Sequence, residues 1–200
     1  MISETALQRI RAVERQIVKN DHETAVAFDT DGNVVFEKVG DTVNVLYTFE
    51  DLTKINGSIV THNHTYDTAS EVFGVKGTSS FSSDDLMIAY QQNLIEVRMV
   101  VADEVYSFRW DNPDKRKAEI FLYEMSELEK DSDVIIKSAE PRIALALDEY
   151  DADPCPRTQL NADKMLTEYY RLQKAQYDKI NEFIADNKQI GYTFRKECTQ

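Results

Sequence analysis

The three histidines of this chain fall in two short segments, and one segment has the spacing of a metal site. They are His22, which precedes Glu23, and the pair His62 and His64, which Asn63 separates. The pair ends a run of β-forming residues, and side chains two residues apart on an extended backbone point the same way. The two imidazoles can therefore converge on one ion. A hydrolytic zinc site needs three protein ligands and an open position for water, and Asp or Glu commonly supplies the third ligand.

The residues alone leave the third ligand open. The acidic residues that follow the pair most closely are Asp67, Glu71, Asp84 and Asp85. Each feature also has a structural interpretation. A His-x-His at a strand end is often incidental, Glu23 can be a solvated charge at a strand edge, and Ser82-x-x-Asp85 is typical of a helix N-terminal cap.

Composition excludes several classes of protein. The 200 residues include 23 Lys and Arg against 36 Asp and Glu, a net charge of −13 that disfavours nucleic acid and anionic lipid as partners. No run of 18 apolar residues suggests a membrane span, and the N-terminus lacks the apolar segment of a signal peptide. Cys155 and Cys198 lack the spacing of a disulfide framework or a Cys-based zinc site, which indicates a reducing, cytoplasmic compartment. We expect one domain, or one domain with an appendage.

Hydrophobic spacing predicts helices interleaved with strands. In the first half we expect a helix over 4–19 capped by Ser3, a hairpin at Asp31-Gly32, and strands at 43–47 and 57–61. In the second half we expect a helix from Ser82 or Ser83 to about 92, strands at 95–102 and 105–110, helices at 115–130 and 162–187, the latter capped by Asn161, and a strand at 190–194. Three prolines predict an irregular insertion over 131–160. The fold class is therefore α/β or α+β, a mixed sheet flanked by helices.

The order Glu23, then His62-x-His64, then Ser82-x-x-Asp85 resembles the signature of the JAB/MPN (JAMM) zinc metalloproteases. The segments VAFDTDGNVVFEKVGD, IVTHNH and SSFSSDDL are most similar to JAB-like domains of bacteriophage minor head and morphogenesis proteins. The resemblance covers residues 20–110 well and the final helix and strand more weakly. It implies the JAB/MPN fold, which is cytidine-deaminase-like.

The resemblance also implies a role for each residue. His62, His64 and Asp85 would bind Zn²⁺, Glu23 would be the general base and acid, and Ser82 would donate a hydrogen bond to the oxyanion. Two departures from the family's pattern stand out: Thr65 replaces a proline, and 17 residues separate His64 from Ser82 where the family has about seven. We expect residues 65–81 to form a mobile or lid-like loop beside the metal, with packing of Phe73 and Val75 into the core as the alternative.

The resulting hypothesis is a zinc-dependent hydrolase of peptide or isopeptide bonds. It would be encoded by a phage or prophage, act on a protein or peptide in the bacterial or phage-infected cytoplasm, and use neither nucleic acid nor membrane. Residues 1–130 would form the metal-binding core, 131–160 the insertion, and 161–200 the closing helix and strand. The alternative is a catalytically inactive JAB-fold module for interactions in phage assembly or counter-defence. The letters HNH at 62–64 do not indicate an HNH nuclease, which spreads those residues over a longer ββα unit.

Overall fold

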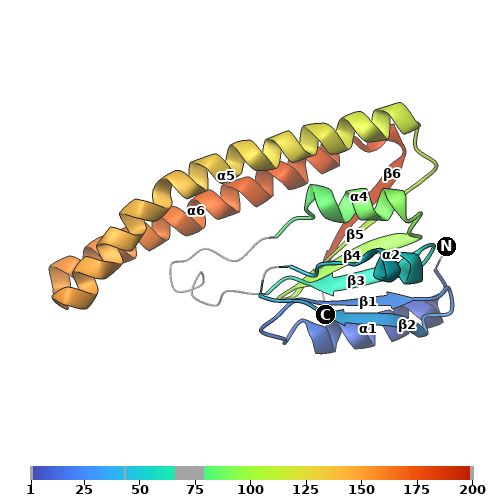
Figure 1. Ribbon diagram of the computed structural model, residues 1–200, viewed down its shortest axis with the longest axis horizontal. Coiled ribbons are helices and arrows are strands. Elements are labelled where there is room, and N and C mark those ends of the chain that lie inside the picture. Colours follow the sequence, from blue (N-terminus) through green and yellow to red (C-terminus); the bar gives the residue numbers. More distant parts are fainter. Residues whose placement is uncertain (1, 43, 66–78, 199–200) are drawn as a thin grey trace.

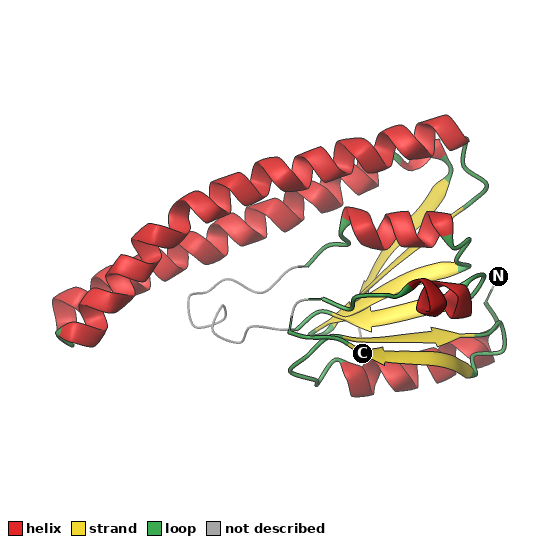
Figure 2. Cartoon of the chain, in the orientation of Figure 1, coloured by secondary structure: helices red, strands yellow, loops and turns green. Residues whose placement is uncertain are grey.

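The computed structural model describes residues 2–42, 44–65 and 79–198. A six-stranded mixed β-sheet forms the body of the molecule, and helices cover both of its faces (Figures 1 and 2). Two long helices continue past the sheet as an antiparallel arm (Figure 2). This is an α+β architecture with a mixed sheet, as the sequence predicts. In the described part of the chain, no helix is both long and apolar enough to cross a membrane.

The sheet has the strand order β2-β1-β3-β4-β5-β6. The strands are β1 (Thr24–Phe28), β2 (Val34–Val39), β3 (Ile59–Asn63), β4 (Glu96–Val101), β5 (Glu104–Trp110) and β6 (Tyr192–Cys198). Only the central pair, β3 and β4, runs parallel, and all other neighbours are antiparallel. A parallel pair requires a crossover connection, and helix α4 (Ser83–Gln91) lies in it. The start of α4 thus follows the carboxyl end of β3.

The two faces of the sheet carry different helices. Helix α1 (Glu4–Ile17) packs Ile10 and Ile17 against one face. Helices α2 (Phe49–Ile55) and α4 cover the other face, together with the body ends of α5 (Lys115–Ala152) and α6 (Pro156–Asp186). Because side chains alternate along a strand, Val60 and His62 lie on the α4 face and Ile59 and Thr61 on the α1 face.

A buried ion pair joins α1 to the sheet. Arg98 of β4 and Glu14 of α1 are 3% and 1% exposed, and Arg98 Nε donates to Glu14 Oε1 over 2.7 Å. Thr61 Oγ1 donates to the same oxygen, and Glu96 accepts from Arg98 Nη1. The network satisfies the charges that α1 buries, so it fixes where this helix sits.

Most of the predicted elements are present, with one error in the first half. Helix α1 with its Ser3 cap, the hairpin at Asp31-Gly32, helix α4 and strands β3 to β6 are confirmed to within a few residues. The strand predicted at 43–47 is wrong for the described residues 44–47, which form no regular element and pair with no described strand. Helix α2 follows instead, because Thr48 and Asp51 form a capping box.

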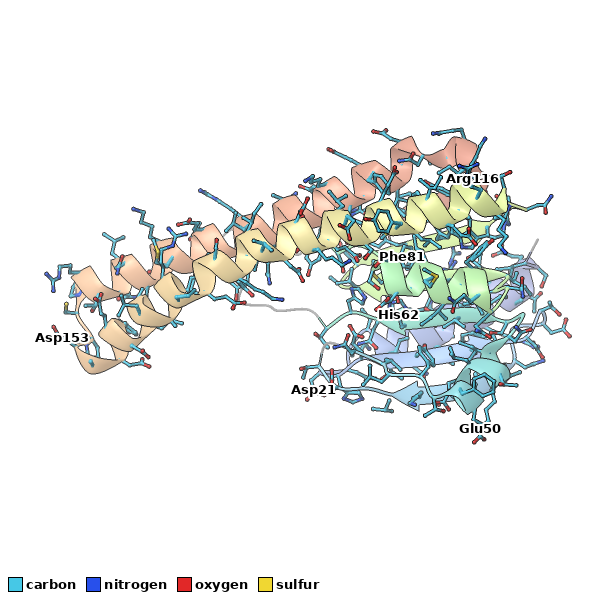
Figure 3. All side chains as sticks on the ribbon, turned by 45° about the horizontal axis from the view of Figure 1, so that its top comes forward. Asp21, Glu50, His62, Phe81, Arg116 and Asp153 are labelled. Atoms are coloured by element: carbon cyan, nitrogen blue, oxygen red, sulfur yellow. The ribbon has the colours of Figure 1, made fainter. Side chains whose placement is uncertain are left out.

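The irregular insertion predicted over 131–160 is also wrong. Helix α5 continues through Pro141 to Ala152, and α6 begins at Pro156 with Cys155 as its N-cap rather than at Asn161. Pro141 removes one hydrogen bond from a 38-residue helix, and packing of α5 against α6 outweighs that loss. Pro156 occupies the first turn, where proline's fixed φ suits a helix. Asp153 marks the turn at the far tip of the arm (Figure 3).

Candidate metal centre

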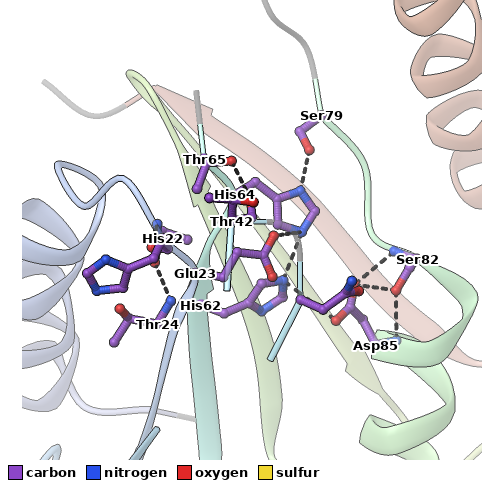
Figure 4. Close-up of polar contacts among 12 residues, drawn as sticks. His22, Glu23, Thr24, Thr42, His62, His64, Thr65, Ser79, Ser82 and Asp85 are labelled. Carbon is purple, nitrogen blue, oxygen red and sulfur yellow. Dashed lines mark hydrogen bonds and ion pairs between the residues drawn. The ribbon is translucent and has the colours of Figure 1, made fainter. Parts of the chain in front are cut away.

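His62, His64 and Asp85 come together at the carboxyl end of β3 (Figure 4). The imidazoles of His62 and His64 project from one side of the strand, with 3.1 Å between their Nε2 atoms. Asp85, in the first turn of α4, places Oδ1 3.6 Å from His62 Nε2. One ligand atom of each residue lies within 4.8 Å of the others, so the group could hold a metal ion.

These separations fit a tetrahedral ion. Two ligand atoms about 2.0–2.1 Å from a tetrahedral zinc lie about 3.3 Å apart. The observed 3.1 Å and 3.6 Å fall on either side of that value. The two separations that involve His62 therefore suit a tetrahedral ion, and the third lies within 4.8 Å.

The carboxylate of Asp85 serves the helix start and the site at the same time. Its Oδ2 accepts hydrogen bonds from the backbone N–H and the hydroxyl of Ser82, and Ser82 Oγ accepts from the Asp85 N–H. The capping interpretation of Ser82-x-x-Asp85 is thus confirmed, and it does not conflict with a role as ligand. The cap leaves Oδ1 facing His62. The hydrogen bonds fix the rotamer that aims it there.

The protonation states of His64 and Asp85 favour the binding of a cation. Burial, the main effect, and the neighbouring His62 both lower the pKa of His64, so its imidazole is neutral near pH 7. Burial acts to raise the pKa of Asp85, but the two histidines and the Ser82 hydrogen bonds outweigh it and hold that pKa below its usual value. A neutral imidazole and an ionised carboxylate are the forms that bind metal.

Glu23 lies beside this group without belonging to it. Its Oε1 is 3.9 Å from His64 Nε2, and the residue is 8% exposed. Burial, followed by the charges of Asp85 and Asp41, raises the pKa of Glu23 to about 7. A carboxyl group with a pKa near neutrality can both accept and return a proton at physiological pH.

The middle residue of the His-x-His segment holds Glu23 in place. Asn63 points to the opposite side of β3, where its Oδ1 accepts from the Thr24 N–H over 2.7 Å and its Nδ2 donates to the His22 carbonyl over 3.0 Å. These bonds clamp the backbone on both sides of Glu23. The backbone of Glu23 itself pairs with Gly40 and Asp41.

A cleft of about 650 Å³ opens over the centre. Its lining residues come from 44–47, from α4 and from α6, and they include Tyr47, Met87, Ile88, Lys174 and Tyr177. Glu23, His62, His64, Ser82 and Asp85 all line it. A ligand in the cleft would therefore touch the body and the arm together.

Other sequence candidates fall away from the centre or outside the described residues. His22 turns from the group and contacts Asp21 (Figure 4), and exposed Asp84 lines the cleft but is not among the three converging residues. Asp67, Glu71 and the predicted lid, including Phe73 and Val75, lie outside the described residues except for the segment's ends. Two residues that matter were not predicted, Asn63 and Ser79. Ser79 Oγ lies 2.5 Å from His64 Nδ1.

Comparison with known proteins gives no relative to argue from: no family model, no curated protein and no solved structure matches this chain. The function has to be argued from the residues of the site.

Proposed function

We propose that this chain is a zinc-dependent hydrolase of peptide or isopeptide bonds with a JAB/MPN-type fold. One observation carries the proposal: two histidines at the carboxyl end of β3 and a carboxylate from α4 lie within 4.8 Å of one another, with a carboxyl group of raised pKa beside them. Zinc suits this mixed imidazole and carboxylate set, and three protein ligands leave one position open. The resemblance of the segments around Glu23, His62 and Ser82 to the JAB/MPN signature supports the same assignment.

The chemistry divides among the residues of the cleft. Zinc held by His62, His64 and Asp85 would polarise the scissile carbonyl and supply water of lowered pKa. Glu23 would take the proton of the attacking water and return it to the leaving nitrogen, because its pKa of about 7 allows both steps. This single group can act as base and then as acid.

Ser82 has a narrower role in the geometry described. Its one hydroxyl hydrogen goes to Asp85 Oδ2 over 2.7 Å, so it orients the ligand. To stabilise an oxyanion, the hydroxyl must rotate from Asp85 towards the cleft that it lines. We therefore assign Ser82 both duties, with the second arising when substrate is bound.

The setting of this activity is part of the proposal. A protein or peptide substrate fits a cleft of about 650 Å³ that is open to solvent. The free thiols of Cys155 and Cys198 are compatible with the reducing cytoplasm of a bacterium or of a phage-infected cell. The similarity to bacteriophage morphogenesis proteins supports a phage or prophage origin.

A second candidate is an interaction module that keeps the fold without turnover. The arm favours it, because the outer part of α5 and the start of α6 expose large apolar side chains. These are Val134, Ile135, Leu145 and Leu160, between 54% and 71% exposed. Exposed apolar side chains on a projecting helical hairpin are compatible with a surface that a partner covers.

One experiment separates the two candidates. Zinc-loaded protein is incubated with a library of peptides and lysine-linked isopeptides, and cleavage is followed by mass spectrometry. The hydrolase proposal predicts zinc-dependent cleavage that Glu23→Gln abolishes while zinc is retained, and that the surface control Glu50→Gln leaves intact. Zinc binding without cleavage of any amide would favour the interaction module, and loss of zinc in Glu23→Gln would make Glu23 a ligand.

A further inference from the structure

Ser79 touches the outer nitrogen of one candidate ligand. Its Oγ lies 2.5 Å from His64 Nδ1, while His64 Nε2 faces His62 Nε2 at 3.1 Å (Figure 4). A neutral imidazole carries its proton on one ring nitrogen and a lone pair on the other. If Nδ1 donates its proton to Ser79 Oγ, the lone pair of Nε2 points into the candidate metal centre.

The position of Ser79 is itself fixed by the arm. Asn181 of α6 donates from Nδ2 to the Ser79 carbonyl over 2.9 Å, across 102 residues of sequence. Asn181 follows Ile180, which is 2% exposed and part of the main core. Ser79 is followed by Ser80 and Phe81, which are both buried, so the backbone that follows Ser79 is packed into the body of the molecule.

The Asn181 side chain has one further feature. Its Oδ1 is buried and has no hydrogen-bond partner among the described residues. This oxygen therefore gives the side chain no hydrogen bond that could orient it. The bond to Ser79 is therefore the polar contact that orients this amide.

We propose that Ser79 is a positioning residue for His64, holding it as the Nδ1–H tautomer with Nε2 directed at the metal, and that Asn181 holds Ser79. The inference builds on the proposed zinc site and extends it, because it links helix α6 of the arm to a ligand of the centre. Ligating histidines commonly donate their second ring N–H to such a partner, and loss of the partner lowers metal affinity about 10–100-fold.

The first test measures zinc affinity of the full-length protein by competition with a chromophoric chelator. We expect Ser79→Ala to bind zinc about 10–100-fold more weakly than wild type, and Ser79→Thr, which keeps the hydroxyl, to stay within a few-fold. Ser80→Ala is the matched control, because Ser79 and Ser80 are each 4% exposed and the described contacts of Ser80 include none of the three ligands. Asn181→Leu should weaken binding in the same direction as Ser79→Ala.

The second test reads the tautomer in metal-free protein. Nitrogen-15 NMR of the histidine rings near pH 7.5 should show His64 protonated at Nδ1 in wild type and redistributed towards Nε2–H in Ser79→Ala. This shift would not follow from a merely structural role for Ser79.

The outcomes separate this inference from the proposed function. Wild type that binds no zinc would refute the zinc hydrolase, while the NMR comparison would still decide the role of Ser79. Tight zinc binding by wild type with less than threefold loss in Ser79→Ala would overturn the positioning role and leave the hydrolase standing. A wild-type His64 protonated at Nε2 would overturn it equally.

Discussion

Glu23→Gln should change how the stability of the metal-free protein depends on pH. The substitution keeps the size of the side chain and removes its titration. Burial, Asp85 and Asp41 raise the pKa of Glu23 from 4.5 to about 7 in the folded protein. In the unfolded chain these causes are absent, so the carboxyl group there titrates near its ordinary value.

The sign of the effect follows from the raised pKa. Below about pH 4.5 the carboxyl group is protonated in both states, and its contribution to folding is fully present. As the pH rises through about 7, the folded protein must ionise a buried group beside Asp85, and that stability is lost. A pKa difference of this size corresponds to about 2–3 kcal/mol between about pH 5 and about pH 8. Relaxation of the site makes this an upper value.

The assay is urea unfolding of chelator-treated protein at about pH 5 and about pH 8. Relative to wild type, the free energy of unfolding of Glu23→Gln should rise by up to about 2–3 kcal/mol between the two pH values. His64 and Asp85 also titrate in the site, but burial, their mutual interaction, His62 and the Ser82 hydrogen bonds cause their pKa shifts, and the substitution removes none of these. Glu50→Gln, whose carboxylate is 79% exposed, should change the unfolding free energy by less than ~0.5 kcal/mol at either pH.

Zinc provides an internal check on the same measurement. Positive charge at the centre favours the ionised form of Glu23, so one equivalent of zinc should shrink the pH-dependent difference between the two proteins. Parallel stability profiles for wild type and Glu23→Gln in metal-free protein would refute the reasoning, because they would place the Glu23 carboxyl in an ordinary aqueous environment.

Three further predictions concern residues around the centre and in the arm. Asn63→Leu should lower the free energy of unfolding in urea by about 1–3 kcal/mol, because it leaves the Thr24 N–H and the His22 carbonyl without their partner. It should also lower hydrolysis more than zinc affinity, and an unchanged stability would contradict the clamp. Arg98→Met should cost about 3–5 kcal/mol by leaving the carboxylate of Glu14 buried and unpaired, and adding Glu14→Leu should restore most of that loss; additive losses in the double variant would argue against the pairing. Pro141→Ala should slow amide hydrogen exchange in the arm by the equivalent of about 1–3 kcal/mol without altering zinc affinity; faster exchange would show that proline is required there.

The parts of the site that the sequence predicts are those governed by short-range periodicity. The period of two along a strand places His62 and His64 on one side, and the Ser82-x-x-Asp85 spacing marks a helix start. Both are properties of five residues or fewer. Short-range patterns do not show that the end of β3 meets the start of α4 in space. The expectation that they meet came from the resemblance to the JAB/MPN signature.

The residues that the sequence did not predict act over long range. Asn63 reaches back 39 residues to Thr24, and Asn181 reaches 102 residues to Ser79. Neither asparagine carries a local pattern that identifies its partner. The alternation of side chains along β3 does indicate that Asn63 points away from the two histidines, and this could have been used to exclude it as a ligand.

The wrong predictions have a shared physical cause, which is that local propensity was overridden by packing. The run Val45-Leu46-Tyr47 is β-forming, but a strand needs a neighbour, and no described strand lies beside it. Pro141 disfavours a helix locally, yet α5 and α6 bury Ile136, Ala139 and Ala162 along their shared length. The Thr48-x-x-Asp51 cap of α2 was a local signal that could have been recognised.

The most direct test of the account is a zinc-edge X-ray absorption spectrum of the protein loaded with one equivalent of zinc. We predict two imidazole ligands, from His62 and His64, and oxygen from Asp85 and water, all at about 2.0–2.2 Å in four-coordinate geometry. The spectrum of Asp85→Ala should lose this set. A zinc–sulfur distance near 2.3 Å, which would place the ion on Cys155 or Cys198, or a spectrum without two imidazoles, would contradict the proposed centre.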